Sequence, residues 1–463
     1  MHLLTITNLY PWPTAPQRGI FNAQLFRAMA CSCEAERQTL TNLVLVPTWR
    51  VWQRTAIRAW REPEGGAGCG GVTGTAAAMK TLYVPVPYIP VVGRNWNWRW
   101  YARALRHHEE EFNRADVVFV PWLYPDGVAA AVLAGVHERP VWLMALGSDR
   151  FHLDVRERRR VILRACNQAA GIVCNARHVG DYLVARGVAR EKIHIVRNGI
   201  GAGFRWRRVG AQGGVGATED GDVGTCGSSH PERSEGSADK TDRIVNKSAP
   251  APRILFVGNL VRIKAPDLAV RAVGALGGGG TTECRGDGVV RPKIETCVAE
   301  PGRGTQSTID NQQSDIRPAP SLLILGTGPM RKKLIRLAAK LGVADRVRFL
   351  GSRPHAEVAE WMNAADCLLL TSRSEGSPNV VAEALACGLP VVATAVGDVP
   401  ERIENGRNGR VVELAPENTL VERLAAAVDT TLNTRWDRQA IAAANPACSW
   451  RDAAEELLQL FQR

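Results

Sequence analysis

The chain has 463 residues, of which 45% are hydrophobic and 22% charged, and its formal net charge at pH 7 is +12. This apolar fraction excludes a chain that is disordered throughout, and the length predicts two or three domains with cores of their own. Residues 1–200 carry 25 Lys and Arg against 15 Asp and Glu, so most of the positive excess lies in the first half and predicts an anionic partner.

In chain order, short β-branched runs alternate with helical patterns. The runs predict strands at Leu3–Thr7, Val117–Val120, Val141–Ala145, Gly171–Cys174, Ile193–Val196, Ile254–Val257, Leu322–Leu325, Val347–Leu350, Cys367–Leu370 and Val391–Thr394. Helices are predicted at 22–30, 154–168, 266–276, 330–341, 355–364, 378–387 and Trp450–Phe461. Strands without polar alternation are typical of parallel sheets buried on both faces. We therefore predict an α/β protein with two doubly wound, Rossmann-like domains that face each other across a cleft.

Two segments have a composition foreign to a packed core. Residues 206–250 and 276–320 are rich in Gly, Ser and charge and follow neither strand nor helix periodicity, so we predict disordered insertions. The predicted organisation is a first Rossmann-like domain over 1–205, the linker 206–250, a second Rossmann-like domain over 251–430 that contains the insertion 276–320, and C-terminal helices over 431–463. Those helices either stay on the second domain or return to the first.

The sequence carries no mark of a secreted or membrane-spanning protein. No run of about 18 apolar residues predicts a transmembrane helix, and Met1–Asn8 lacks the basic and long apolar regions of a signal peptide. The eleven cysteines are scattered and do not form the pattern of a disulfide framework. We therefore expect a cytoplasmic protein.

The most informative segment is Ser374–Val392, which follows a predicted strand. Ser377 suits the N-cap of a helix, Pro378 its first position, and Gly388 the position after its end. A helix that begins here directs free N–H groups into the cleft, where they can bind a phosphate or sugar hydroxyls. Glu375 and Glu383 are either surface glutamates or ligand-binding groups, and their place after a strand of an open sheet favours ligand binding.

This segment resembles the family-4 retaining glycosyltransferases of the GT-B fold, which carry Glu-x7-Glu on such a helix, followed by G-x-P and a strand. Further stretches resemble the same family in order and spacing. They are Phe256–Lys264, Leu325–Pro329, Val347–Gly351, Ala365-Asp366 and Gly397–Glu401 in the second half, and Tyr10-Pro11, Gly19–Phe21, Asp126-Gly127, Gly147–Asp149 and Asn198–Ile200 in the first.

The resemblance implies roles for particular residues. Lys264 would neutralise the diphosphate of a nucleotide diphosphate sugar, which is the expected donor, and Glu375 would contact the transferred sugar. Glu383 would accept hydrogen bonds from the ribose hydroxyls. Further donor-binding positions implied by the resemblance are Gly326, Gly328, Gly376, Ser377, Pro378 and Asn379. Gly19 would let the opposite domain approach the diphosphate closely, although an ordinary turn explains a lone glycine equally well.

This chain departs from the family pattern at two positions. Asn259 stands where the family often has an arginine, and Arg262 is the nearest substitute. Leu146 stands where many relatives carry a histidine, so an acid or base role at that position is in doubt. Asp126 and Asp149 are carboxylates on the acceptor side, and Asp149 either serves the acceptor or satisfies backbone amides in its own loop.

The resemblance thus implies transfer of a sugar, with retention, to a lipid-linked or polysaccharide acceptor in cell-envelope or exopolysaccharide synthesis. It implies no metal and no cofactor besides the nucleotide sugar as co-substrate. An inactive GT-B scaffold and a nucleotide-sugar epimerase of the same fold are the alternatives.

The run Arg94–Tyr101, followed by Arg103 and Arg106, interleaves aromatic and basic residues. Such a pattern suits peripheral contact with an anionic membrane on the inner face, or stacking on sugars. The alternative is a helix start whose aromatic rings pack into the core. Nucleic acid is not expected as a partner, because no nucleic-acid-binding module is recognisable.

Overall fold

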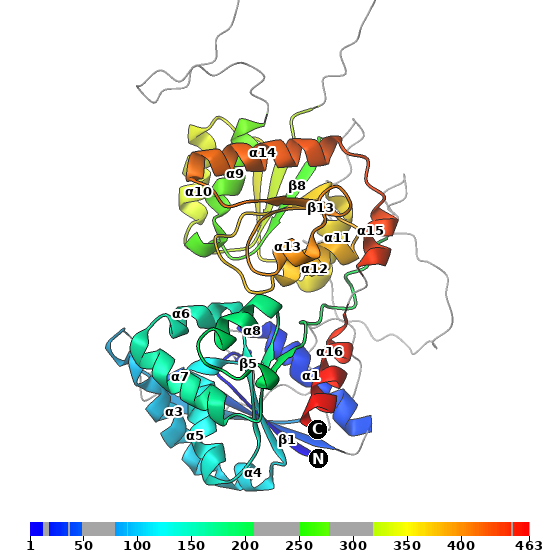
Figure 1. Cartoon of the computed structure of the whole chain (residues 1–463). Helices are drawn as coiled ribbons and strands as arrows, with labels where there is room; N and C mark the ends of the chain where they lie inside the picture. Colours follow the sequence, from blue (N-terminus) through cyan, green and yellow to red (C-terminus); the bar gives the residue numbers. More distant parts are fainter. Residues whose placement is uncertain are drawn as a thin grey trace, which may run out of the picture.

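The computed structural model describes residues 1–12, 18–35, 38–48, 79–89, 91–207, 251–276, 318–445 and 448–462. They form two lobes, one built mainly from the first half of the chain and one from the second (Figure 1). The predicted insertions 206–250 and 276–320 lie almost wholly outside the described residues.

The first lobe is built around a seven-stranded sheet in the order β3-β2-β1-β4-β5-β6-β7, in which all neighbouring strands pair in parallel. The strands are β1 (His2–Thr7), β2 (Thr39–Thr48), β3 (Met79–Pro87), β4 (Val117–Val120), β5 (Val141–Ala145), β6 (Gly171–Cys174) and β7 (Ile193–Ile195). Each strand predicted for this half is present within one residue of its predicted bounds, and β2 and β3 are additional.

The second lobe repeats this design with a six-stranded parallel sheet in the order β10-β9-β8-β11-β12-β13. Its strands are β8 (Arg253–Val257), β9 (Ser321–Leu325), β10 (Val347–Gly351), β11 (Cys367–Leu370), β12 (Val391–Thr394) and β13 (Gly409–Val412). Only β13 is additional to the prediction. Two doubly wound parallel sheets confirm the predicted fold class.

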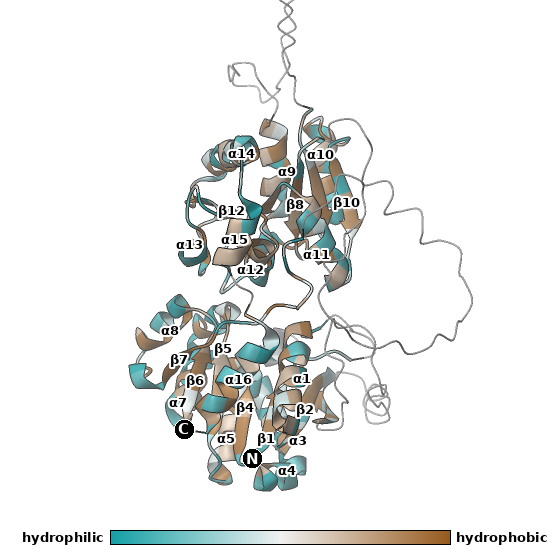
Figure 2. Ribbon diagram, turned by 90° about the vertical axis from the view of Figure 1, so that its right-hand side faces the viewer, coloured by the Kyte–Doolittle hydropathy of each residue, from teal (hydrophilic) through white to brown (hydrophobic). Residues whose placement is uncertain are grey.

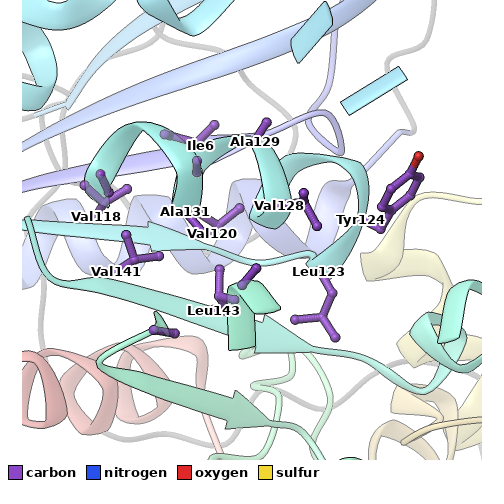
Figure 3. Close-up of a cluster of buried hydrophobic side chains, with 14 of the residues drawn as sticks. Ile6, Val118, Val120, Leu123, Tyr124, Val128, Ala129, Ala131, Val141 and Leu143 are labelled. Carbon is purple, nitrogen blue, oxygen red and sulfur yellow. The ribbon is translucent and has the colours of Figure 1, made fainter. Parts of the chain in front are cut away.

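Helices cover both faces of the first sheet, which explains why its strands are apolar on both sides (Figure 2). On one face, α3 (Asn97–Leu105), α5 (Val128–Val136) and α7 (Arg156–Gln168) pack over the strand residues Ile6, Val120 and Leu143 (Figure 3). The opposite face is covered by α1 (Ile20–Ala35) and α16 (Trp450–Phe461). The other helices of this lobe are α4 (Glu109–Arg114), α6 (Arg150–Leu153) and α8 (Arg177–Val184).

The second sheet is also covered on both faces. Its helices are α9 (Pro266–Ala275), α10 (Arg331–Lys340), α11 (His355–Ala364), α12 (Asn379–Ala386), α13 (Val399–Arg402), α14 (Glu417–Asn433) and α15 (Arg438–Ala444). The predicted boundary at 431 therefore falls inside α14, which belongs to the second lobe. No helix among the described residues combines the length and apolarity needed to cross a membrane.

The last helix, α16, returns to the first lobe. The ring of Phe461 lies 5.2 Å from that of Phe119 and 5.3 Å from that of Trp142, which are both on the first sheet. A capping box starts the helix, because Ser449 and Asp452 each accept a hydrogen bond from the other's backbone N–H. The N–H of Ile200 donates to the carbonyl of Cys448 at 2.9 Å, so the outgoing and returning segments cross between the lobes side by side.

Candidate active site

A cavity of about 220 Å³ opens between the lobes at the carboxyl ends of both sheets, the edge at which open α/β sheets bind ligands. The loops after β5, β11 and β12 and the helices α6 and α8 supply most of its wall. Its lining includes Leu146, Gly147, Asp149, Arg150, Leu153 and Tyr182 from the first lobe, and Arg373, Ser374, Glu375, Val396 and Gly397 from the second.

Lys264 contacts Glu375, which lines this cavity. Lys264 ends a 3-10 turn after β8, Glu375 lies in the loop after β11, and the Nζ of Lys264 lies 2.6 Å from Oε1 of Glu375. The hydroxyl of Ser372 donates to the same carboxylate oxygen at 2.5 Å. The hydroxyl of Thr371 donates to the carbonyl of Ala265 at 2.8 Å, which joins the two loops next to the ion pair. The two residues assigned catalytic roles from the sequence are therefore brought together from neighbouring strands.

Ser377 has a different role from the one predicted. Helix α12 begins one residue later than expected, at Asn379, with Pro378 as its N-cap residue and no side-chain cap. The Ser377 hydroxyl instead donates to Asp398 at 2.8 Å and accepts from Arg402 at 2.8 Å, while Arg402 also pairs with Asp398 at 2.6 Å. This triad fixes the segment before α12 against the loop after β12. Gly388 does follow the helix end, with a φ of +65°.

Asn379 joins the two lobes. Its side-chain oxygen accepts a hydrogen bond from Asn198 of the first lobe at 3.1 Å. One turn further along α12, the carboxyl of Glu383 is only 6% exposed, and desolvation raises its pKa to about 7. When ionised, Glu383 would accept hydrogen bonds well. Because its pKa lies near neutral pH, its charge changes easily with pH.

The backbones of the two lobes lie very close together at two glycines. A Cβ added to Gly147 would lie 2.1 Å from the Cα of Gly376, and one added to Gly376 would lie 2.6 Å from the Cα of Gly147. Neither position has room for a side chain while the lobes are in this arrangement. Gly376, predicted to bind substrate, thus also sets how closely the lobes approach beside the cavity.

The loops after β8 and β9 pack backbone to backbone. Gly326 and Gly328 adopt φ values of +144° and +157°, and a Cβ on Gly326 would lie 1.9 Å from the carbonyl oxygen of Gly258. This packing accounts for both glycines without a ligand. Asn259 and Arg262 are exposed on the first of these loops, where a bound molecule can reach them.

Asp126, predicted to bind substrate, lies beneath the loop after β1. Its side chain is fully buried, and one carboxylate oxygen accepts the N–H of Asn8 at 2.6 Å. Burial raises its pKa to about 8. The prediction that Asp126 contacts the substrate directly is therefore wrong for this arrangement. Asp126 instead positions the loop that carries Gly19. Gly19 has a φ of +61°, and a Cβ there would lie 2.1 Å from the carbonyl oxygen of Leu9, so the turn itself requires glycine.

Asp149 accepts hydrogen bonds from backbone amides, which is one of the two roles predicted for it. Its carboxylate accepts the N–H of Leu146 at 2.7 Å and that of Leu123 at 3.3 Å. Burial raises its pKa to about 7. It lines the cavity and holds the loop after β5 that faces Gly376.

The buried Asp126 predicts a pH-dependent stability. Its folded pKa of about 8 lies above its ordinary value of 3.8, so the folded state holds a proton that the unfolded chain releases. The free energy of unfolding therefore falls as the pH rises between these values, by at most about 1.4 kcal/mol per pH unit for this group. Asp126→Asn, which keeps an acceptor for Asn8, should flatten the decline. Urea unfolding between pH 5 and pH 9 measures the effect.

Asp116→Asn is the matched control for this measurement. Asp116 also accepts a backbone N–H, that of His2 at 2.7 Å, but it is exposed. Its replacement should leave the slope of stability against pH unchanged. Identical slopes for the wild type and Asp126→Asn would show that Asp126 is ionised in the folded protein throughout this range.

Several polar residues of the site have no role predicted from the sequence. Asp398 and Asn198 lie in stretches that resemble the family, but the resemblance implied no function for them. Arg402 and Ser372 carry no motif signal. Their contribution follows only from which loops meet at the cleft.

Two parallel α/β lobes with charged and glycine-rich loops around the cleft between them define a protein of the GT-B type. A family model described as Glycosyl transferases group 1 matches residues 303–434, and one described as Glycosyltransferase Family 4 matches residues 69–202. Together these matches take in more than half of the chain. The chain belongs to the family-4 glycosyltransferases.

Individual relatives are more distant. The D-inositol 3-phosphate glycosyltransferase of Thermomonospora curvata is 32% identical over 179 residues, which are 38% of this chain and 35% of that protein. That of Streptomyces coelicolor is 34% identical over 159 residues, 34% of this chain and 28% of that protein. The chain spans about a third of the length of the curated relatives it matches.

Solved structures match over the whole chain. HepE of Anabaena in complex with UDP has a TM-score of 0.62 at 14% identity and covers 100% of both chains. Sucrose-phosphate synthase from Thermosynechococcus elongatus has a TM-score of 0.63 at 16% identity and covers 100% of this chain and 98% of that one. At such identities these likenesses show the fold alone.

Proposed function

We propose that this protein transfers a sugar from a nucleotide diphosphate sugar to an acceptor hydroxyl, with retention at the anomeric carbon and without a metal. The observation that carries the proposal is the contact of Lys264 with Glu375, the residue of the pair that lines the cavity between the lobes. A lysine and a carboxylate supported by Ser372 are the groups that a leaving diphosphate and a reacting sugar require on one side of a cleft.

The donor diphosphate would lie between Lys264 and the first turn of α12. Breaking the bond between the anomeric carbon and the phosphate oxygen leaves negative charge on that oxygen, and the Lys264 ammonium group offsets this charge. Arg262 is exposed near the same loop and can add a second positive charge. With diphosphate bound, Lys264 turns toward phosphate and frees Glu375 to accept a hydrogen bond from the sugar.

The acceptor proton needs a destination. Leu146 lines the cavity where many relatives have a histidine, so no base is supplied from that position. We assign the proton to the departing phosphate oxygen, which lies on the face that the acceptor attacks in a retaining transfer. Glu383 would accept hydrogen bonds from the ribose, and its elevated pKa makes donor binding weaker below neutral pH.

The acceptor is proposed to be a lipid-linked or polysaccharide intermediate of cell-envelope or exopolysaccharide synthesis, used in the cytoplasm. The first-lobe wall of the cavity supports this choice, because Leu123, Leu153 and Val179 make it apolar while Arg150 and Tyr182 add polar groups. The names of the curated relatives point to D-inositol 3-phosphate as a competing acceptor, and the neighbour bound to UDP points to UDP-sugars as first donors.

A donor panel tests the proposal. Purified protein is incubated with UDP-, GDP- and ADP-sugars, binding is measured by thermal shift, and nucleotide release is measured with a membrane lipid extract, with D-inositol 3-phosphate, or with no acceptor. We expect one nucleotide sugar to bind and its turnover to require an acceptor and to persist in EDTA. Release of a free sugar epimer without acceptor would identify an epimerase, and binding without turnover would identify a scaffold.

A further inference from the structure

The solvent-facing side of α3 has an unusual composition. Trp96, Arg99, Trp100, Arg103 and Arg106 recur at the spacing of one helical face and are all exposed, with Trp96 58% and Trp100 40% exposed. The residues between them, such as Tyr101 and Leu105, are buried in the lobe's core. The predicted packing of the aromatic run therefore holds only in part: Trp98 packs on the core, and its two tryptophan neighbours do not.

The two neighbouring helices of the same layer continue this composition. α5 packs between α3 and α7 and exposes Val132 (40%) and Val136 (74%) one turn apart. α7 exposes Arg156, Arg160 and Arg164, again one turn apart. We call the surface formed by these three helices the arginine–tryptophan face. Its members are Trp96, Arg99, Trp100, Arg103, Arg106, Val132, Val136, Arg156, Arg160 and Arg164.

Among the described residues, no ion pair neutralises the positive charge of this face. None of its six arginines has an ion pair with another residue in the part of the chain that the structure describes. Glu157 is the exposed acidic residue on α7. Six unpaired like charges around exposed valine and tryptophan side chains repel one another and leave apolar surface in water, so the face suits an anionic partner with an apolar interior.

An anionic lipid bilayer has these properties. Tryptophan rings settle at the boundary between headgroups and acyl chains, and arginine side chains extend past apolar neighbours to reach lipid phosphates. Each basic side chain near such a surface adds to the attraction. Val132 and Val136 add exposed apolar surface that a bilayer can bury, whereas a nucleic acid would gain nothing from them.

The face also adjoins the cavity. α6 packs against α7 on the side of the first lobe that faces the second lobe (Figure 1). It contributes Arg150 and Leu153 to the cavity wall, while Phe151 is 53% exposed. A molecule anchored in a bilayer at this face could therefore approach the cavity past α6. The relation between the face and the reaction rests on the proposed function, but the membrane contact does not.

We propose that the arginine–tryptophan face docks the first lobe onto an anionic lipid membrane. The test is sedimentation of the full chain with vesicles of phosphatidylcholine alone or mixed with one third phosphatidylglycerol, without donor or acceptor. The wild type should bind the anionic vesicles only. Arg99→Gln/Arg103→Gln/Arg106→Gln should weaken binding roughly a hundred-fold, because each basic residue near the surface contributes about 1 kcal/mol.

α10 of the second lobe supplies the matched control. Lys332, Lys333 and Arg336 are exposed there, and Lys332→Gln/Lys333→Gln/Arg336→Gln removes the same charge from another helix. This variant should bind as the wild type does. Trp96→Ala/Trp100→Ala should bind at low salt but be released by high salt, because most of the remaining attraction is then electrostatic.

Three outcomes would overturn the proposal. Equal weakening by the α3 and α10 triple variants would show attraction to net charge alone. Absence of binding to the anionic vesicles would remove the membrane as partner, and tighter binding to a single-stranded oligonucleotide than to vesicles would assign the face to nucleic acid. Because no donor is present, failure here leaves the proposed transfer reaction untouched, and an inactive but vesicle-bound protein would leave the docking surface standing.

Discussion

Replacing Lys264 by alanine is expected to lower the rate of sugar transfer by roughly a hundred- to a thousand-fold, the usual effect of removing one group that stabilises developing charge. The Lys264 ammonium group is positioned by its 2.6 Å contact with Glu375 and lies on the loop after β8. Without it, the leaving diphosphate keeps its charge in a partly enclosed cleft. The loss should fall mainly on kcat, because the charge develops in the transition state.

Glu375→Gln removes the negative charge of this side chain but keeps its size and shape. The Gln side chain still accepts the Ser372 hydroxyl, but it no longer attracts Lys264 or carries negative charge near the sugar. We expect a comparable fall in kcat and a nearly unchanged melting temperature, since one part-exposed ion pair contributes little to stability. Glu375→Ala should abolish transfer and leave the fold intact.

Lys80→Ala provides the matched comparison. It removes another lysine–glutamate pair, with a Lys80 Nζ to Glu111 Oε1 distance of 2.8 Å, from the start of β3, where no cavity residue lies. Its kcat should equal that of the wild type. Transfer at the wild-type rate by Lys264→Ala or by Glu375→Gln would remove that residue from the mechanism.

Most strands could be predicted because their residues are apolar and β-branched throughout. Three could not: the neighbouring strands β2 and β3 at one side of the first sheet, and β13 at one edge of the second. β3 reads Met79–Pro87 with prolines at 85 and 87, and prolines inside a run argue against a strand. The structure places β3 at the edge of its sheet, where a missing N–H on the outer side is tolerated. Whether a strand lies at an edge depends on the whole topology, which a local pattern does not contain.

The site was predictable to the same degree. Lys264 and Glu375 follow strands that lie next to each other in the sheet, so a doubly wound order alone brings them together. The burial of Asp126 and the hydrogen bond from Ser377 to Asp398 could not be predicted, because both depend on which loops pack next to these residues. A short polar side chain takes whichever partner the neighbouring loop presents, and neighbouring loops are distant in sequence.

The second large effect is expected on stability, from Arg438 at the start of α15. Its guanidinium group donates to five backbone carbonyls: those of Met362, Asn363 and Ala365 at the end of α11, and those of Cys387 and Gly388 after α12. Carbonyls at helix ends lack partners within the helix, and positive charge is favourable there. Burial lowers the pKa of Arg438 from its ordinary value, and no carboxylate is hydrogen-bonded to it among the described residues.

Arg438→Met keeps the length of the side chain and removes all donors. Several buried carbonyls then lose their partner at once, so the free energy of unfolding should fall by about 3–5 kcal/mol. This corresponds to a drop of roughly 10 °C in the melting transition of the second lobe. Differential scanning calorimetry measures it, and Arg438→Lys, with fewer donors and no planar fork, should fall between the two.

Arg435→Met, three residues earlier in the same connection, is the control, because Arg435 is exposed. Its melting transition should match that of the wild type. If the Arg438→Met protein melts at the same temperature as this control, water reaches the ends of α11 and α12 and replaces the guanidinium group. A true loss would show that this side chain helps to hold α15 on the second lobe, together with the buried Ile441, before the chain returns as α16. In that case the first-lobe transition, supported by the packing of Phe461 on Phe119 and Trp142, should stay where it is.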